Sequence, residues 1–498
     1  MDVSLRGEDD GDATSCEVAA ADAASVASLL DSTTSTVLAY TTAEKVHGRR
    51  WRQALVDLLY EGKVSHFVID EGHTLYTWGR TFRPHIGQLG QFLNEVCEEA
   101  SAMRRRQGRS PTRRAARIVV TATCPPHVER FIETSAQLVN SASVRTPSRR
   151  FNLEIVVKPM QLGNAADDVA SSIRSTENNS SSSLSPPSDT ADTAMIFSNT
   201  IRCAKLVTTK LRAAGSTLPE DSYGIMHGEL TFREKRDVIE RLMTGRLHAL
   251  VGTPSLHMGI DVTNLSRVVF VQIPTSLIDL YQAMGRAGRG TASIAVIEVL
   301  FDVNCIACCL GLIAGDAIGL ADFTLVIELL VDAEYCKHSF LSVALGDARR
   351  PVHARSRADC CSTCTALYLG KTTSLPRNVT VQVVALCATI QHLAASTGKA
   401  PTISTLLIQS RSGMHDWASD SGAWTKKMRA FLIFYLIGPR KYRILHFVAS
   451  DNDEVGTNRP YSSAPVAVNS LALAEHVQTL RQIIIPFPDS VCDGRGRV

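Results

Sequence analysis

A short apolar run that ends on two neighbouring carboxylates is the feature that most limits how this chain can fold. Residues 66–69 have the β-branched and aromatic character of a strand, and Asp70 and Glu71 follow them directly. Gly72 breaks the strand, and His73 opens a loop that is rich in aromatic residues. Two adjacent carboxylates repel each other and lose hydration unless a cation or a positioned water shares their site. The pattern therefore predicts a strand end that faces a ligand, and magnesium on a nucleotide fits that need.

Strands and helices alternate along two stretches of the chain, which predicts parallel sheets and an α/β fold class. In the first stretch we expect strands at 36–40, 64–69 and 118–121, a helix with Trp51, Leu55, Leu58 and Leu59 on one face, and a helix at 86–100. In the second we expect strands at 194–198, 247–252 and 268–273, and helices at 201–214, before 243 and at 277–284. Each stretch is long enough to form a separate lobe.

Composition divides the rest of the chain. The predicted parts are a disordered or weakly helical leader (1–35), a first lobe (36–160), a Ser-rich linker or insertion (161–192), a second lobe (193–318), a small helical module (319–375) and a C-terminal region (376–498).

Charge and cysteine content limit the partners of the chain. A net charge of +3 over 498 residues does not by itself imply a polyanion, so nucleic-acid binding must rest on local sites. Seven arginines lie between residues 104 and 117; a solvated loop explains them, and a targeting or phosphate-binding patch is the alternative. Thirteen cysteines without a secretory leader favour free thiols or a metal site over disulfides. The most apolar run, 294–314, is interrupted by polar residues, so we expect no membrane span.

Residues 70–84 resemble the DExH box and the aromatic-rich loop of RecQ helicases, which reads Asp-Glu-Ala-His, then Trp-Gly, then Phe-Arg-Pro. Residues 41–45 resemble motif Ib of that family, with Ala43 in place of a proline, and residues 121–123 resemble motif III. Residues 257–261 and 281–289 resemble motifs V and VI. The series is in order over roughly residues 36–300 and implies two RecA-like lobes, the first of them incomplete.

The resemblance also implies roles for individual residues. The implied catalytic residues are Asp70, Glu71, His73, Gln282, Arg286 and Arg289. The implied ATP-binding residues are Asp70, which would hold Mg²⁺, with Gly259, Asp261, Arg286 and Arg289. The implied DNA-binding residues are Trp78, Phe82, Arg83, Thr123, Ser198 and Thr253.

Physical chemistry agrees with several of these roles. Two arginines three residues apart and flanked by glycines bring planar donors close to phosphates without bulky neighbours. Trp78 would stack on bases, although a core position for this aromatic side chain is the alternative. The chain departs from the family at Arg80 and Thr81, which replace His and Asp, and at Gly290, which replaces an acid that would orient Arg289.

Four cysteines resemble the zinc module that follows the RecQ motor. They are Cys336, Cys360, Cys361 and Cys364. Cys361 and Cys364 form a C-x-x-C, a spacing that lets two thiolates bind one tetrahedral metal ion. The sequence leaves two candidates for the remaining ligand, Cys360 and His353, and degenerate free thiols are the alternative to zinc. The C-terminal region resembles a degenerate winged helix only faintly, with helices expected at 381–395 and 425–437 and a strand at 442–448.

A phosphate-binding loop upstream of the acidic pair is the part of the family pattern that we do not find. Gly370-Lys371-Thr372 has the right ending, but Thr365 stands where the first glycine belongs. Without the neighbouring strand we expect a marginally stable first lobe with an uncovered apolar face.

The resemblance implies an ATP-dependent 3′-to-5′ DNA helicase of recombination and repair. It would act in the nucleus on single strands and duplex junctions, with ATP, Mg²⁺ and a zinc ion. The alternatives are a catalytically silent DNA-binding remnant and a sequence that has lost its opening. Under the first hypothesis, Asp70 and Arg289 face one shared cleft.

Overall fold

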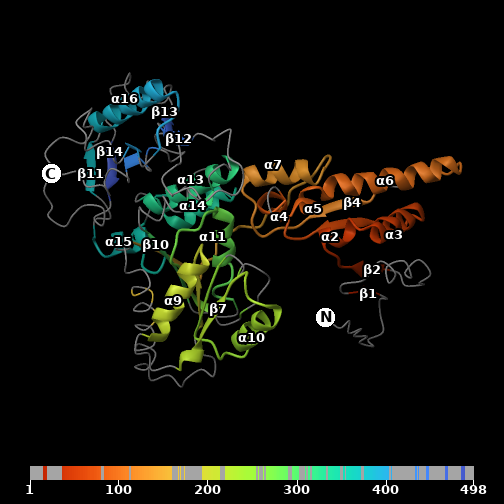
Figure 1. Ribbon diagram of the computed structural model, residues 1–498, viewed down its shortest axis with the longest axis horizontal. Helices are drawn as coiled ribbons and strands as arrows, with labels where there is room; N and C mark the ends of the chain where they lie inside the picture. Colours follow the sequence, from red (N-terminus) through yellow and green to blue (C-terminus); the bar gives the residue numbers. More distant parts are fainter. Residues whose placement is uncertain are drawn as a thin grey trace. The chain divides into compact units, whose positions relative to one another are not determined.

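The chain divides into two compact units in this computed structural model, residues 1–146 and residues 147–498 (Figure 1). Apart from shorter pieces, the structure describes residues 36–79, 83–111, 114–159, 193–213, 219–253, 265–289, 294–301, 317–332, 335–347, 355–371 and 380–402.

The centre of unit 1 is the parallel pair of strands β3 and β4, and helices cover one face of this pair. Its elements are β1 (Ser15–Val18), β2 (Thr36–Ala39), α2 (Ala43–Val46), α3 (Arg49–Tyr60), β3 (His66–Ile69), α4 (His73–Thr77), α5 (Pro84–Gly87), α6 (Leu89–Arg106), β4 (Ala116–Val119) and α7 (Pro126–Ser135). The apolar face of α3, with Trp51 and Leu59, packs against Phe92 and Val96 of α6, as the spacing of these residues predicts.

The opposite face of the β3–β4 pair is exposed. Side chains alternate across a strand, so Phe67 points to the helices while Val68 points away from them. Val68, Ile118 and Val120 are 54%, 43% and 48% exposed. The apolar face that we expected to be uncovered is therefore present.

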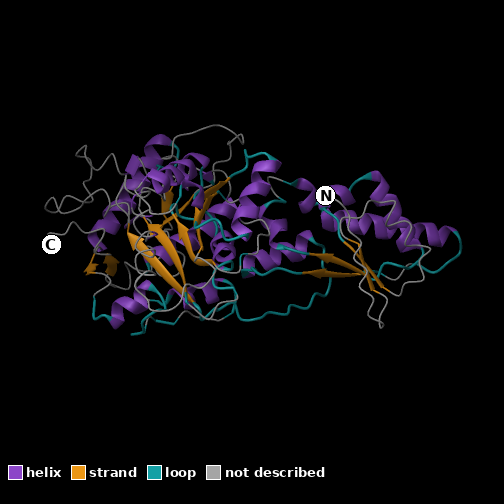
Figure 2. Cartoon of the chain, turned by 90° about the horizontal axis from the view of Figure 1, so that it is seen from below, coloured by secondary structure: helices purple, strands orange, loops and turns teal. Residues whose placement is uncertain are grey.

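Unit 2 contains a six-stranded, all-parallel sheet with the strand order β5-β10-β9-β6-β8-β7. Its elements are β5 (Leu153–Pro159), β6 (Thr193–Phe197), α9 (Ile201–Ala213), η2 (Glu220–Ser222), β7 (Tyr223–Met226), α10 (Phe232–Met243), β8 (Ala249–Gly252), β9 (Leu265–Phe270), α11 (Leu277–Met284) and β10 (Ala295–Phe301). Figure 2 draws the strands in orange and the helices in purple.

Helices cover both faces of this sheet, so its central strands are apolar throughout. In β6, Ile196 belongs to the core that also contains Val207 of α9. Its neighbour Met195 belongs to the other core, which contains Val238 of α10 and Leu280 of α11. The α/β fold class with a parallel sheet is confirmed.

The strand at 153–159 corrects one of our predicted boundaries. We ended the first lobe at residue 160, which includes this strand, but β5 pairs in parallel with β10 and forms an edge of the unit 2 sheet. Strand pairing joins residues far apart in sequence, so local pattern does not determine the partner of an isolated strand.

Two other segments also differ from expectation where they are described. Most of the predicted leader and linker lies outside the described residues. The leader contains β1, which pairs in parallel with β2, and was not predicted as a strand. Within the expected linker, Val169 and Ile173 are buried in the core beneath α9.

The C-terminal part of unit 2 begins with three helices, α13 (Ala317–Val331), α14 (Lys337–Ala344) and α15 (Ser362–Tyr368). Then come β11 (Leu375–Asn378), α16 (Thr380–Thr397), β12 (Leu445–Phe447), β13 (Val466–Val468) and β14 (Ile484–Phe487). β11 pairs with β14 and β12 with β13, both antiparallel, and these pairs do not confirm a winged helix. Within the described residues, every helix is too short or too polar to span a bilayer.

Candidate functional site

The two carboxylates lie where the sequence predicted, directly after the last residue of β3. Asp70 and Glu71 are both exposed. Glu71 has a φ of +49°, and its backbone N–H donates to Asp70 Oδ1 at 2.8 Å. A left-handed conformation at a non-glycine residue costs free energy and is common at functional sites.

His73 connects the acidic pair to the end of the neighbouring strand. Its ring is buried, and Nδ1 lies 3.3 Å from Glu71 Oε2 and 3.2 Å from Thr121 Oγ1. Thr121 Oγ1 also donates to the carbonyl of Thr123 at 3.2 Å. The hydroxyl of Thr123 is buried and has no hydrogen-bond partner among the residues that the structure describes. The structure thus brings the acidic box and residues 121–123 together.

Gly72 is required where the chain turns from β3 into α4. Its backbone N–H donates to Val120 O at 2.9 Å, so it lies directly against β4. A Cβ at this position would lie 2.2 Å from Val119 Cγ1. The glycine that replaces the family's alanine therefore fits the valine beside it.

The aromatic loop lies beside the stretch that resembles motif Ib. Trp78 is half-buried, and the guanidinium of Arg83 lies 5.0 Å from the centre of its ring. Arg83 Nε also lies 3.7 Å from Glu44 Oε1 in α2. Trp78 is thus neither a core residue nor fully exposed, whereas Phe82 lies outside the described residues.

Some arginines of the stretch 104–117 form hydrogen bonds within unit 1, whereas others are exposed to solvent. Arg104 donates to Tyr60 O at 2.6 Å, and Arg117 donates to Ala136 O at 2.8 Å, so both support the fold of unit 1. Arg105 and Arg106, in the last turn of α6, are exposed. A solvated helix end accounts for these two residues.

In unit 2, the residues that resemble motif VI lie at the end of α11 and in the turn after it. Gln282 is half-buried, Arg286 is buried and Arg289 is exposed. Gly288, with a φ of +64°, donates its N–H to Leu265 O at the start of β9. The turn therefore lies at the amino ends of the strands.

Two residues that sequence reasoning missed hold this turn. Arg150 donates to Gly285 O at 3.0 Å and to Gly288 O at 3.1 Å, and Asn152 donates to Gly288 O at 2.8 Å. Arg289 Nε donates to Gly285 O as well, at 2.9 Å. Polar residues immediately before a strand were the only sequence signal for this contact.

Ser198 and Thr253 lie at the other end of the strands of this sheet, the carboxyl end. They follow the carboxyl ends of the adjacent strands β6 and β8, where parallel sheets usually bind ligands. Their side chains are buried, and Ser198 Oγ donates to Thr200 O at 3.1 Å. Gly259 and Asp261 lie outside the described residues.

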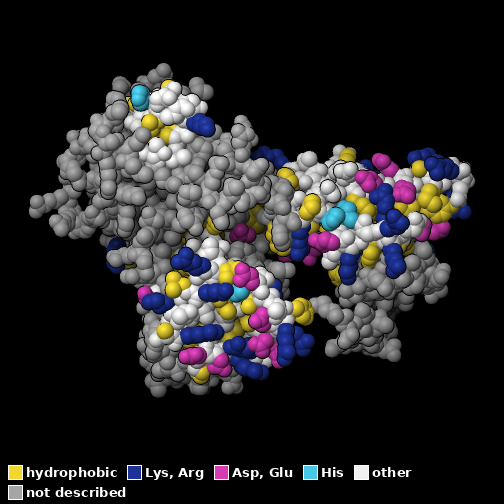
Figure 3. Space-filling model, in the orientation of Figure 1, with side chains coloured by type: hydrophobic (Ala, Val, Ile, Leu, Met, Phe, Trp, Pro, Cys, Tyr) yellow, Lys and Arg dark blue, Asp and Glu magenta, His cyan; other side chains and the backbone are white. Residues whose placement is uncertain are grey.

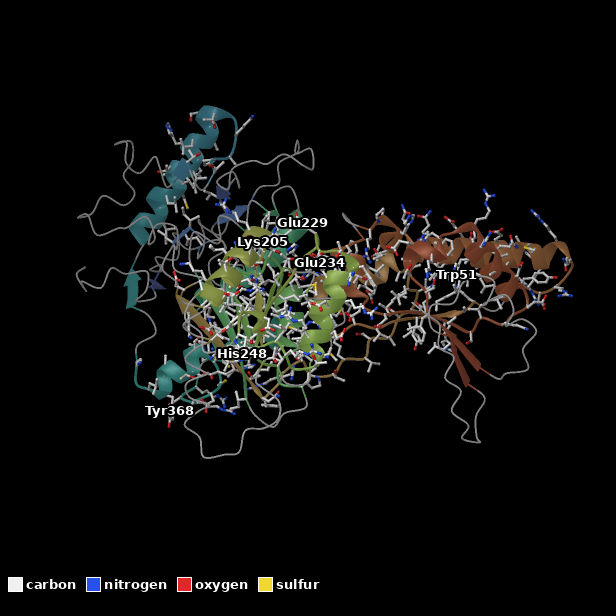
Figure 4. The ribbon with its side chains drawn as sticks, turned by 60° about the horizontal axis from the view of Figure 1, so that its bottom comes forward. Trp51, Lys205, Glu229, Glu234, His248 and Tyr368 are labelled. Atoms are coloured by element: carbon white, nitrogen blue, oxygen red, sulfur yellow. The ribbon has the colours of Figure 1, made fainter. Side chains whose placement is uncertain are left out.

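The loop after β7 lies close to α9 and α10. Lys205 Nζ of α9 is 3.9 Å from Glu229 Oε2, and Lys235 donates to Gly228 O at 3.1 Å (Figure 4). Glu234 forms a capping box with Thr231 at the start of α10. Around α10, basic and acidic side chains are interspersed (Figure 3).

The four cysteines form one buried cluster. The sulfur atoms of Cys336, Cys360, Cys361 and Cys364 all lie within 4.8 Å of one another. The Cys336 and Cys360 sulfurs are 3.8 Å apart, close to the edge of a tetrahedron with zinc–sulfur bonds of about 2.3 Å. His353 instead stacks on Tyr335. The donor set therefore fits a structural zinc ion, with Cys360 rather than His353 as the remaining ligand.

The pKa values of Cys336, Cys360 and Cys364 are shifted in different directions. Hydrogen bonds from the thiols of Cys360 and Cys361 lower the pKa of Cys336 well below its usual value. The same bond to Cys336 raises the pKa of Cys360, and burial raises the pKa of Cys364 to about 11. Lys337 is buried nearby and donates to Leu329 O at 2.5 Å. Burial lowers the pKa of Lys337, whereas the charges of Asp332, Cys361 and Cys336 act in the opposite direction.

Gly370 and Lys371 do not form a phosphate loop. Gly370 follows the end of α15 and has a φ of +66°, as is usual for a glycine that ends a helix. A phosphate loop would have to precede a helix, because the helix amino end binds the anion.

A family model and several curated relatives match parts of this chain. The model of the helicase conserved C-terminal domain matches residues 184–291, which end just after the turn that carries Arg289. ATP-dependent DNA helicase Q5 of Rattus norvegicus is 28% identical over 260 residues, 51% of this chain and 24% of that protein. ATP-dependent DNA helicase RecQ of Bacillus subtilis is 26% identical over 232 residues, 46% of this chain and 33% of that protein.

Over about half of its length, the chain is similar to RecQ-type helicases. It spans about a quarter to a third of the length of these two relatives. Among solved structures, the helicase Lhr of Mycobacterium smegmatis bound to single-stranded DNA and AMP-PNP is 16% identical with a TM-score of 0.37, over 64% of this chain and 37% of that one. The helicase MrfA bound to DNA is 15% identical with a TM-score of 0.40, over 58% and 38%.

Proposed function

We propose that this RecQ homologue is an ATP-dependent 3′-to-5′ DNA helicase that acts in recombination and repair. The observation that carries the proposal is the contact of His73 with both Glu71 and Thr121. It joins the acidic pair at the end of one strand to the loop that follows the neighbouring strand. A motor needs such a connection, because nucleotide chemistry has to change the grip on a nucleic acid.

The acidic pair divides the nucleotide chemistry between its two members. Asp70 would hold Mg²⁺ on the ATP phosphates, and Glu71 would accept a proton from the attacking water. The contact of Glu71 with His73 supports this division, because it sets Glu71 apart from Asp70 in its surroundings. His73 would pass a change at Glu71 to Thr121 and Thr123.

Unit 2 would contribute positive charge to the same reaction. Arg289 is exposed at its turn and would reach the terminal phosphate, while Arg286 and Gln282 would lie beside it. Gly259 and Asp261 would complete the nucleotide site by resemblance.

DNA would lie along both lobes. Trp78, with Arg83 already stacked on its ring, offers a π surface for a base and a cation for a phosphate. Phe82 would add a second aromatic surface, and Thr123, Ser198 and Thr253 would contact the strand. The buried hydroxyl of Thr123 supports its role, since a small shift would expose an unused hydrogen-bonding group.

The four-cysteine cluster would hold a zinc ion. Four sulfur donors with tetrahedral spacing and no displaceable ligand form a closed site, so the ion would stabilise the fold rather than enter the reaction.

We also propose, from the resemblance to RecQ helicases, that the protein acts in the nucleus. A fluorescent fusion that is excluded from nuclei would contradict this.

Phosphate release stimulated by single-stranded DNA tests the proposal. The parent chain should bind labelled ATP, release phosphate and unwind a 3′-tailed but not a 5′-tailed duplex. Glu71→Gln should bind ATP and lose phosphate release, whereas Glu61→Gln, at the exposed end of α3, should match the parent.

A second candidate function is DNA binding without hydrolysis. It is favoured by the printed sequence, which contains no G-x-x-x-x-G-K-S/T segment. If the parent binds the tailed duplex but neither binds ATP nor releases phosphate, the helicase proposal is wrong and the second candidate is supported.

A further inference from the structure

The turn that carries Arg289 is held from outside its own motif. The carbonyls of Gly285 and Gly288 point toward the segment before β5, where Arg150 donates to both of them. Asn152 adds a second donor to Gly288 O. A guanidinium donates several hydrogen bonds in a fixed plane, so one arginine can fix two carbonyls at once.

Gly285 O is the informative atom, because two guanidinium groups share it. Arg289 Nε lies 2.9 Å from this oxygen and Arg150 Nη1 lies 3.0 Å from it. An arginine that moves to a phosphate has to break such a bond. A carbonyl that is left without a hydrogen-bond donor destabilises the folded protein. Here Arg150 would keep Gly285 O bonded after Arg289 has left.

The segment that carries Arg150 is itself fixed. β5 begins at Leu153, whose carbonyl lies 3.0 Å from His338 Nε2, and Asn152 O accepts from Ala295 N at 2.9 Å. Burial lowers the pKa of Arg150; the neighbouring Tyr281 raises it, and the charge of Arg289 lowers it. Two like charges kept this close favour the departure of the exposed one toward an anion.

We propose that Arg150 and Asn152 are positioning residues: they hold the turn of residues 285–289 and keep its carbonyls bonded when Arg289 turns to a phosphate. This inference rests on the proposed ATP hydrolysis for its functional part. Its structural part, the clamp on the turn, stands without it.

Hydrogen exchange tests the clamp without any nucleotide. In Arg150→Met, the amide of Gly288, which bonds Leu265 O, should exchange about tenfold faster, because the turn loses both hydrogen bonds that Arg150 donates to it. Arg149→Met is the matched control. Arg149 is next to Arg150 in the sequence, but its side chain is exposed and its guanidinium lies over the ring of Phe151. Equal exchange in Arg150→Met and the parent would overturn the proposal.

Kinetics test the functional part. Arg150→Met should lower the kcat of ATP hydrolysis about tenfold, with the KM for ATP within about twofold, because the loss acts when Arg289 moves. Arg150→Lys, which keeps the charge but not the fork, should recover only part of the rate. An unchanged kcat in Arg150→Met contradicts the role, whereas a parent without hydrolysis contradicts the proposed function and leaves the exchange result to decide the clamp.

Discussion

Replacing Gly72 by alanine should destabilise unit 1 through a single contact. The added Cβ would lie 2.2 Å from Val119 Cγ1, whereas two carbon atoms pack at about 3.5 Å, so one of them has to move by about 1.3 Å. Val119 is β-branched and paired in β4, so its side chain rotates at a cost. Overpacking of this kind costs about 1–3 kcal/mol.

A double-mutant cycle isolates that contact. Val119→Ala alone should cost about 1 kcal/mol, because it removes partly buried methyl groups. Gly72→Ala combined with Val119→Ala should be more stable than the sum of the two single changes predicts, by about 1 kcal/mol or more. Effects of alanine on the start of α4 cancel in this cycle, because they do not depend on Val119.

Native-state hydrogen exchange gives the required free energies for unit 1 alone. The amide of Val120 is a suitable probe, because it bonds Ile69 O at 2.9 Å and reports on the β3–β4 pair. Gly228→Ala is the control, since a Cβ there meets no heavy atom within 4 Å. If the two changes at positions 72 and 119 add within about 0.5 kcal/mol, the predicted clash is absent and the reasoning is refuted.

Three further predictions follow from the site. Compared with protein at a free zinc concentration 100 times Kd, protein stripped of zinc by a chelator should have a free energy of unfolding that is lower by about 2.7 kcal/mol. The loss would be measured as a lower midpoint of thermal unfolding. A Cys361→Ser variant that still binds a full equivalent of zinc would contradict the site. His73→Ala should reduce the stimulation of phosphate release by DNA about tenfold while ATP binding persists, because the link to Thr121 is lost; unchanged stimulation would refute the coupling. Burial and the charge of Asp359 raise the pKa of Glu154, so the folded state holds this proton more tightly and stability falls as pH rises through that pKa. Glu154→Gln should therefore stabilise the protein at pH 7 and have little effect near pH 4 in urea unfolding; equal effects at both would contradict the shift.

Local patterns predicted the elements that local forces determine. The apolar spacing of Trp51, Leu55 and Leu59 identified α3, and uninterrupted apolar residues identified β6 and β8. The position of the acidic pair at a strand end was also predictable, because the strand and the break at Gly72 are both local.

Tertiary contacts explain what the sequence did not predict. The pairing of β5 with β10 joins residues more than a hundred positions apart, and nothing in β5 itself specifies that partner. Arg150 and Asn152 bind backbone carbonyls, which every residue has, so no side-chain pattern marks their targets. The choice of Cys360 over His353 likewise depended on how two distant segments meet.

The cysteine segment also closes the outer edge of the unit 2 sheet. Ile155 donates its N–H to Cys360 O at 3.2 Å, and Val157 donates to Ser362 Oγ at 3.4 Å. A strand without such cover is a template for pairing with another molecule. If oxidation of these thiols displaces the segment, β5 becomes free to pair with another molecule. The first sign of oxidation during storage should therefore be aggregation, seen as turbidity or an increase in particle size.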